Sequence, residues 1–196
     1  MVQAQQEDTP TGALEPIAIC GMSMRLPGAV RGAEAFWKAL VEKRKLKCIV
    51  PEDRFNVKAF YSSQAKPGTI ISPEAFYLSD AELGHLDTSM IPIAAHELRH
   101  IDPQQRMLLE ITRECLENAG ETNWRGKRVG CYVGTFGEDW IDLGAKDTLD
   151  ANMYRAASSS DFALSNRLLY EYNFRSPSIT IKTGCSIAIM GLNKVY

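Results

Sequence analysis

The most informative stretch of this chain is SPSITIKTGCSIAIMGL, residues 176–192. Its first half, Ser178–Lys182, is rich in β-branched residues and follows a proline, which predicts a buried β-strand. Its second half, Ile187–Leu192, is apolar and predicts the start of a helix. Gly184 permits a sharp turn between the two, so Cys185 is expected at a junction of strand and helix.

Such a junction has chemical consequences for Cys185. The N-terminus of a helix carries a partial positive charge, which favours a thiolate, the nucleophilic form of cysteine. Backbone N–H groups there can also hold the oxyanion that forms when a thiolate attacks an acyl carbonyl. The position therefore indicates a catalytic nucleophile. Position alone also leaves open a small cysteine that packs in the core.

The rest of the chain alternates between strand and helix patterns. Short apolar or alternating runs predict strands at Pro16–Gly21 and Arg128–Thr135. Amphipathic patterns predict helices at Ala33–Lys45, from Asp102 to Gly120, and from Asp161 through Leu169. This alternation predicts an α/β fold with a mainly parallel sheet.

The helix after Asp102 has the clearest end signals. Asp102 suits the N-cap, and Pro103 suits the first helical position because its missing N–H would have no partner there. Gln105 lies three residues after the cap and predicts a capping-box contact. Gly120 is expected to end the helix.

Composition excludes several classes of protein. A net charge of −2 over 196 residues argues against a nucleic-acid partner, and no apolar run reaches the roughly twenty residues of a membrane helix. The polar residues 1–14 predict a disordered leader, and the stretches Pro51–Met90 and Phe136–Asp150 predict irregular connections. The chain has five widely spaced cysteines without a C-x-x-C pair, which are Cys20, Cys48, Cys115, Cys131 and Cys185. This spacing predicts neither a disulfide framework nor a cysteine-ligated zinc site, so a reducing cytoplasm is expected.

Several motifs together resemble one enzyme family. EPIAICGMSMRLPG (15–28), FW (36–37), VPEDRF (50–55), IDPQQR (101–106) and SPSITIKTGCS (176–186) occur in the order found in β-ketoacyl synthase domains of polyketide synthases. The resemblance covers nearly the whole chain. It is therefore specific.

Details of these motifs point to one branch of the family. Lys182 and Gly184 before the cysteine look most like fungal highly reducing iterative polyketide synthases. The chain departs from the family pattern at Ser176, where a glycine is usual, and at Ile187 and Ala188, where serines and then leucines are usual.

The resemblance implies a thiolase-like α/β fold. Residues 15–196 would be the N-terminal region of a β-ketoacyl synthase domain, a truncated half-domain whose second half is encoded after Tyr196. In the family, the strand near Ile17 lies centrally in the sheet. The strands near Val129 and Ile179 would flank it on one side.

The resemblance also implies a reaction. Cys185 would accept an acyl chain from the phosphopantetheine arm of an acyl carrier protein, with its own N–H as one oxyanion donor. A decarboxylative Claisen condensation with a malonyl unit would follow. The family supplies two histidines and a lysine for that step from its C-terminal half, whereas His85, His96 and His100 all precede the cysteine.

Partners follow from the same resemblance. They are an acyl carrier protein that carries the acyl or malonyl thioester, the C-terminal ketosynthase half, and a second copy in a homodimer. No directly bound cofactor and no metal are implied. We expect this chain not to complete condensation alone. A ketosynthase-like remnant or binding module without catalysis is the alternative.

A third hypothesis rests on His96-Glu97-Leu98-Arg99-His100, which fits the H-E-x-x-H motif of zinc hydrolases. The motif needs a helix that places both histidines on one face, but Asp102 and Pro103 begin a new helix immediately afterwards. A solvated surface turn is the expectation favoured here.

Overall fold

The computed structural model describes residues 16–79, 83–89, 91–146 and 155–195. The predicted leader, residues 1–14, lies outside these ranges. At the centre, strands β5 (Cys131–Gly134) and β6 (Ser178–Ile181) run parallel, with Cys131 opposite Ser178 and Gly134 opposite Ile181. This pair confirms the two strands predicted around residues 128–135 and 178–182.

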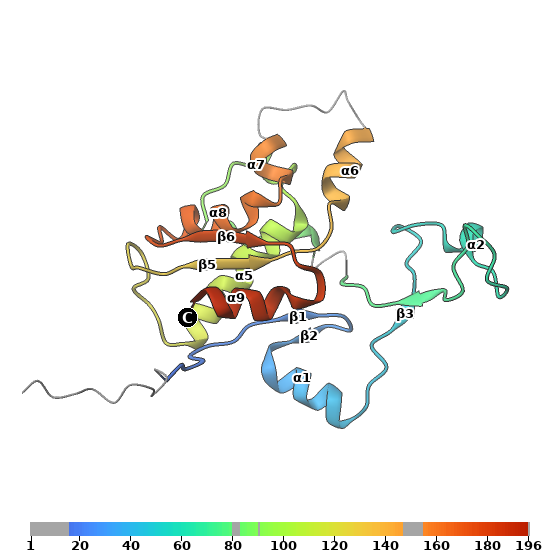
Figure 1. The fold of residues 1–196 in the computed structure, drawn as a ribbon, viewed down its shortest axis with the longest axis horizontal. Helices are drawn as coiled ribbons and strands as arrows, with labels where there is room; N and C mark the ends of the chain where they lie inside the picture. The colour runs from blue at the N-terminus through green and yellow to red at the C-terminus, as the bar shows by residue number, and fades with distance from the viewer. Residues whose placement is uncertain (1–15, 80–82, 90, 147–154, 196) are drawn as a thin grey trace, which may run out of the picture.

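Helices cover both faces of this strand pair (Figure 1). Helices α5 (Pro103–Asn118) and α8 (Phe162–Glu171) pack against each other, and α8 contacts both strands. Helix α9 (Ile187–Val195) lies along the other face and contacts mainly β5. The result is the predicted α/β layering of helix, sheet and helix.

The hydrophobic core lies between the strand pair and α5 and α8. Successive residues of a strand point to opposite faces, and Cys131 and Val133 point into this core. Tyr172 closes one end, where its hydroxyl donates to the carbonyl of Leu109 at 2.6 Å. The buried members are Ile91, Leu109, Cys131, Val133, Leu164, Leu168, Tyr172 and Phe174.

Helix α5 shows which of its end signals act locally. The Oδ1 atom of Asp102 accepts the N–H of Gln104 at 2.7 Å, Pro103 is the first helical residue, and Gly120 has a φ of +71° after the helix. These three predictions are confirmed. The capping box is wrong, because the amide of Gln105 is buried and donates to the carbonyl of Ala157 at 3.0 Å.

The strand predicted at Pro16–Gly21 is not formed. Ile19 is 84% exposed, and the sheet that contains β5 has two strands among the described residues. The segment instead runs past the C-terminal end of α5, where a Cβ on Gly21 would overlap the carbonyl of Cys115 and the N–H of Met22 donates to Asn118 Oδ1 at 2.9 Å. An apolar run becomes a strand only when a neighbouring strand supplies its hydrogen bonds. The central position expected for Ile17 is therefore wrong in this structure.

Shorter elements surround this central body. Strands β1 and β2 form an antiparallel ribbon that leads into α1, and the side chain of Arg25 on β1 pairs with Glu114 on α5. Helix α1 confirms the helix predicted from Ala33, although it ends at Val41 rather than Lys45. The remaining bounds are β1 Arg25–Leu26, β2 Val30–Arg31, α1 Gly32–Val41, β3 Cys48–Ile49, α2 Val57–Phe60, β4 Glu74–Ala75, α4 Ala95–Leu98, α6 Asp139–Lys146, α7 Arg155–Ser159 and the 3₁₀ turn η2 Gly184–Ser186.

Two predicted irregular connections contain regular elements. In Pro51–Met90, α2 and the short strand β4 form, and β4 pairs antiparallel with β3. The acidic connection after β5 forms α6, which Trp140 fixes by donating from Nε1 to the carbonyl of His100 at 3.1 Å. Across the described ranges, no helix is long and apolar enough to span a membrane.

Candidate active site

Cys185 lies in the turn that joins β6 to α9. Gly184 has a φ of +62°, a conformation that costs little without a Cβ, and the turn continues as η2 until α9 begins at Ile187. The Ile187 N–H donates to the carbonyl of Gly184, and Ser186 Oγ donates to the carbonyl of Thr183 at 3.0 Å. The Cys185 side chain is exposed. The structure thus places Cys185 at the predicted junction.

The first residue of α9 packs directly on the backbone of β5. A Cβ built on Gly134 would overlap Cγ2 of Ile187 and lie 3.0 Å from its Cβ. Glycine at position 134 therefore lets α9 approach the strand closely. This contact fixes the turn on its C-terminal side.

A cluster of charged side chains fixes the turn on its N-terminal side. The ammonium of Lys182 lies 2.9 Å from Oδ2 of Asp161 and also bonds Oε1 of Glu138. The hydrogen bonds to Glu138 and then to Asp161 raise the pKa of Lys182. The hydrogen bond from Lys182 is also the main reason that the pKa of Asp161 lies below its usual value. We call Lys182, Asp161 and Glu138 the lysine cluster.

The IDPQQR motif reaches the same edge of the sheet through hydrogen bonds. The N–H of Thr135 donates to the carbonyl of Ile181 at 3.1 Å, and its hydroxyl donates to Gln104 Oε1 at 3.1 Å. The other end of that amide donates to Asp102 Oδ2 at 3.2 Å. Burial raises the pKa of Asp102. The motif therefore links the start of α5 to the ends of β5 and β6.

Sequence reasoning missed most of this framework. Asp102 was identified as a helix cap, but its second oxygen also holds Gln104. Glu138 lies in a connection predicted to be irregular, and Asp161 begins a predicted helix. Neither pattern indicates the bond that each makes to Lys182. The available signal was the order of the parallel strands, because residues that follow two neighbouring parallel strands meet at one edge of the sheet.

The five thiols differ in their surroundings. Cys131 is buried in the core, and burial raises the pKa of its thiol to about 11. Cys115 is half-buried, whereas Cys20, Cys48 and Cys185 are exposed. Exposure therefore does not separate Cys185 from two other thiols. Its place at the strand–helix turn does.

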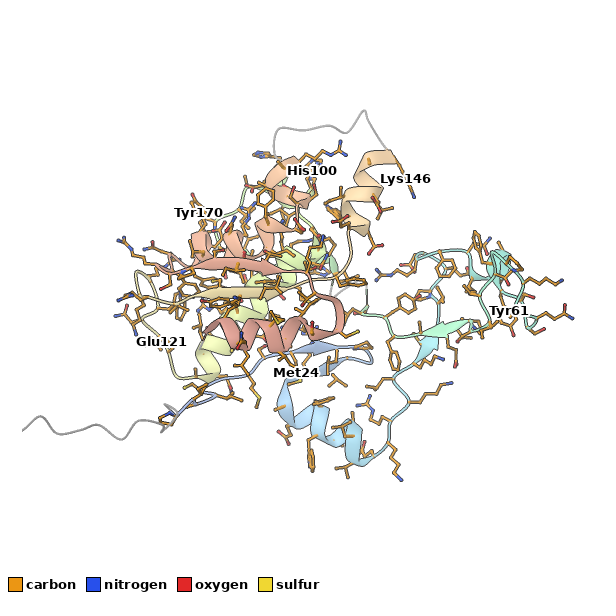
Figure 2. The ribbon with its side chains drawn as sticks, in the orientation of Figure 1. Met24, Tyr61, His100, Glu121, Lys146 and Tyr170 are labelled. Atoms are coloured by element: carbon orange, nitrogen blue, oxygen red, sulfur yellow. The ribbon has the colours of Figure 1, made fainter. Side chains whose placement is uncertain are left out.

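The H-E-x-x-H residues lie elsewhere. Helix α4 covers Ala95–Leu98, which is one short turn. Glu97, the general base of such a motif, accepts a hydrogen bond from Arg167 at 2.7 Å. His100 lies at the end of the molecule where α6 and α7 project (Figure 2). Within the described part of the chain, no group of three His, Cys, Asp or Glu side chains is arranged to hold a metal ion.

The sequence of this chain matches a known enzyme family. Residues 14–195 match the sequence model of the β-ketoacyl synthase N-terminal domain. The chain belongs to the β-ketoacyl synthase family. It is 51% identical over 183 residues to a highly reducing polyketide synthase of Glarea lozoyensis, and 52% identical over 178 residues to another from a Fusarium species. These alignments cover 93% and 91% of the chain but 7% of each relative.

Solved ketosynthases share the fold. The chain superposes on an oxazolomycin ketosynthase domain of Streptomyces albus with a TM-score of 0.71 at 30% identity, covering 89% of this chain and 30% of that one. It superposes on the ketosynthase of bacillaene synthase module 6 from Bacillus subtilis with a TM-score of 0.72 at 26% identity, covering 91% and 29%. The predicted thiolase-like fold is confirmed, and the chain corresponds to the N-terminal part of that fold.

Proposed function

We propose that Cys185 accepts an acyl chain as a thioester within a polyketide-forming β-ketoacyl synthase. One observation carries the proposal, which is the exposed thiol of Cys185 in the turn between β6 and α9. The turn is held from both sides, by the lysine cluster and by the contact of Ile187 with Gly134. A thiol fixed beside the first turn of a helix is well placed for attack on a carbonyl.

The acyl transfer exchanges one thioester for another, so its atoms balance between the two thiols and the acyl group. The Cys185 thiolate attacks the carbonyl carbon of a thioester on the phosphopantetheine arm of an acyl carrier protein. The negative charge of the tetrahedral intermediate then lies on oxygen, where the backbone N–H of Cys185 is the proposed donor. Collapse of the intermediate breaks the old carbon–sulfur bond, and the released pantetheine thiolate takes up a proton.

Condensation requires more than this. Decarboxylation of a malonyl thioester would release carbon dioxide and leave an enolate, which attacks the acyl-Cys185 carbonyl and expels the cysteine thiolate. An enolate and its precursor need proton donors that stabilise the developing charge. All three histidines of this chain precede Cys185, and His96 and His100 lie on or just after α4. We therefore assign condensation to the assembled enzyme with its C-terminal ketosynthase half, and acyl acceptance to this chain.

The acyl acceptance is tested with a simple thioester donor. The purified chain is incubated with the N-acetylcysteamine thioester of hexanoic acid, and the acylated residue is identified by peptide mapping. We expect the acyl group on Cys185 and its loss in Cys185→Ala. The matched control is Cys48→Ala, which removes another exposed thiol.

The same experiment separates the alternative function. An unacylated chain, or acylation spread equally over Cys20 and Cys48, would favour a ketosynthase-like domain without catalysis. With malonyl carrier protein added, we expect no condensed product from this chain alone. A condensed product would show that it carries a complete catalytic set.

A further inference from the structure

The lysine cluster joins three segments that lie far apart in the sequence. Lys182 follows β6 and precedes Cys185 by three residues, Asp161 caps the N-terminus of α8, and Glu138 lies in the connection from β5 to α6. Lys182 and Glu138 are 44 positions apart. One ammonium therefore holds the ends of two parallel strands and one helix at the edge where the cysteine turn begins.

The segment before Lys182 is already fixed to α8. The hydroxyl of Thr180 donates to the carbonyl of Asp161 at 3.1 Å, and it lies 2.9 Å from the hydroxyl of Ser165. Beyond Lys182, Ile187 packs on Gly134 of β5. The turn that carries the cysteine thus spans two attachment points, and Lys182 is the first of them.

We propose that Lys182 is a positioning residue that holds the Cys185 turn in the geometry required for acyl transfer. This inference rests on the proposed function of Cys185. A long cationic side chain is needed here because it must reach two carboxylates on different segments. A neutral side chain of similar length would leave Glu138 and Asp161 without their shared partner.

Because the lysine cluster is partly exposed, we expect it to affect the position of the Cys185 turn more than the free energy of unfolding. The Lys182, Asp161 and Glu138 side chains are 34%, 32% and 56% exposed, respectively. Ion pairs with this exposure contribute little to the free energy of unfolding because water screens them. The orientation of a backbone N–H toward an oxyanion is more sensitive, because small misplacements of reacting groups can lower rates by about 100-fold.

Two reactions of the same thiol distinguish these roles. Acylation by the hexanoyl thioester passes through an oxyanion and needs the turn in place. Alkylation by iodoacetamide displaces iodide at a saturated carbon, without an oxyanion. A positioning residue therefore affects acylation much more than alkylation.

The experiment measures both rates at Cys185 in Lys182→Met, Lys182→Arg and a matched control. The control is Lys127→Met, which removes a lysine bonded to Glu121 at 2.8 Å. Lys146 is the last residue of α6, and Glu121 lies at the opposite end of the molecule from it (Figure 2). All rates are measured on soluble monomer at low concentration, with circular dichroism as the check of folding.

We expect Lys182→Met to lower acylation about 10-fold and alkylation less than about 2-fold. Lys182→Arg should keep most of the acylation rate, because its guanidinium can bond both carboxylates. Lys127→Met should leave both rates unchanged. If Lys182→Met does not fold, Glu138→Gln tests the same link, with acylation again expected to fall more than alkylation.

Two results would overturn the inference. One is acylation of Lys182→Met at the wild-type rate, and the other is an equal fall in acylation and alkylation. If the wild-type chain is not acylated at all, the proposed function is refuted, and the positioning role is tested by a second measurement. Amide hydrogen exchange at residues 183–187 then decides the positioning role, because faster exchange in Lys182→Met than in Lys127→Met supports it and equal exchange refutes it.

Discussion

Gly134 on β5 and Ile187 at the start of α9 are in direct contact, with the isoleucine side chain occupying the space that a Cβ on residue 134 would need. The contact joins the end of one strand to the helix that follows the other. Because Cys185 lies two residues before Ile187, the separation of α9 from β5 also determines where the thiol is held. Interiors as dense as those of proteins leave little room for adjustment at such a contact.

Gly134→Ala should therefore destabilise the chain and displace α9. We expect a loss of about 1–3 kcal/mol in the free energy of unfolding, the usual cost of overpacking. Urea unfolding followed by circular dichroism measures it. The double variant with Ile187→Ala should lose less than the sum of the two single losses, because the Cγ2 atom that overlaps the new Cβ is gone. Additive losses in the double variant would show that the two residues do not interact.

Thiol labelling should rank the cysteines by position as well as exposure. At neutral pH we expect iodoacetamide to modify Cys185 first. Cys131 should stay unmodified in the folded chain, because burial excludes the reagent and raises the thiol pKa to about 11. Time-resolved peptide mapping gives the order. Faster modification of Cys20 or Cys48, which are also exposed, would contradict the assignment of Cys185.

Acid should weaken the attachment of β1 to α5. The hydrogen bond from Arg25 is the largest cause that holds the pKa of Glu114 below its ordinary value of 4.5. A carboxyl with a lowered folded pKa stabilises the protein above the unfolded pKa, and this contribution is lost as the pH falls through the folded pKa. The stabilising contribution of Glu114 is therefore expected to be lost below about pH 4.5.

Glu114→Gln tests this pH dependence. At pH 7 the variant should lose about 1–2 kcal/mol, because the 7% exposed Arg25 side chain loses its charged partner, although the 43% exposed Glu114 side chain leaves the pair partly screened. The difference from the wild type should shrink as the pH is lowered below 4.5. Thermal unfolding between pH 3 and 7 measures it. A difference that stays constant over this range would exclude the Arg25 pair as the cause.

Exposed apolar side chains should make the chain associate as its concentration rises. Helix α1 exposes Trp37 and Val41, and α9 exposes Ile189 and Leu192. Apolar faces of this kind drive association when they are uncovered. Size-exclusion chromatography across a concentration series should show a growing share of larger species, reduced by Trp37→Lys with Ile189→Lys. A single monomer peak at every concentration would refute this.

Local signals made part of this structure predictable. The strand at Ser178–Ile181, the cap at Asp102 and the end of α5 at Gly120 depend on residues within a few positions of one another. Distant contacts were not predictable in this way. The amide of Gln105 bonds the carbonyl of Ala157, 52 positions away. The apolar run that contains Ile19 has the composition of a strand, but among the described residues no neighbouring strand pairs with it.

The candidate site divides along the same line. Cys185 could be found because the strand, the glycine turn and the helix that surround it are contiguous in the sequence. The lysine cluster could not, because each member has an ordinary local interpretation. Asp161 does cap α8, through Oδ1, while Oδ2 bonds Lys182. A residue with two roles shows only the local one in its sequence pattern.

The order of these attachment points along the chain has a consequence for biosynthesis. Asp102, Gln104, Thr135, Glu138 and Asp161 all precede Cys185 in the sequence. A ribosome makes the chain from its N-terminus. All five of these residues, which hold the Cys185 turn or the strand ends beside it, are therefore synthesised before the cysteine is added. The Cys185 turn is therefore synthesised after the residues that contact it from the N-terminal side, and it can fold onto them once it leaves the ribosome.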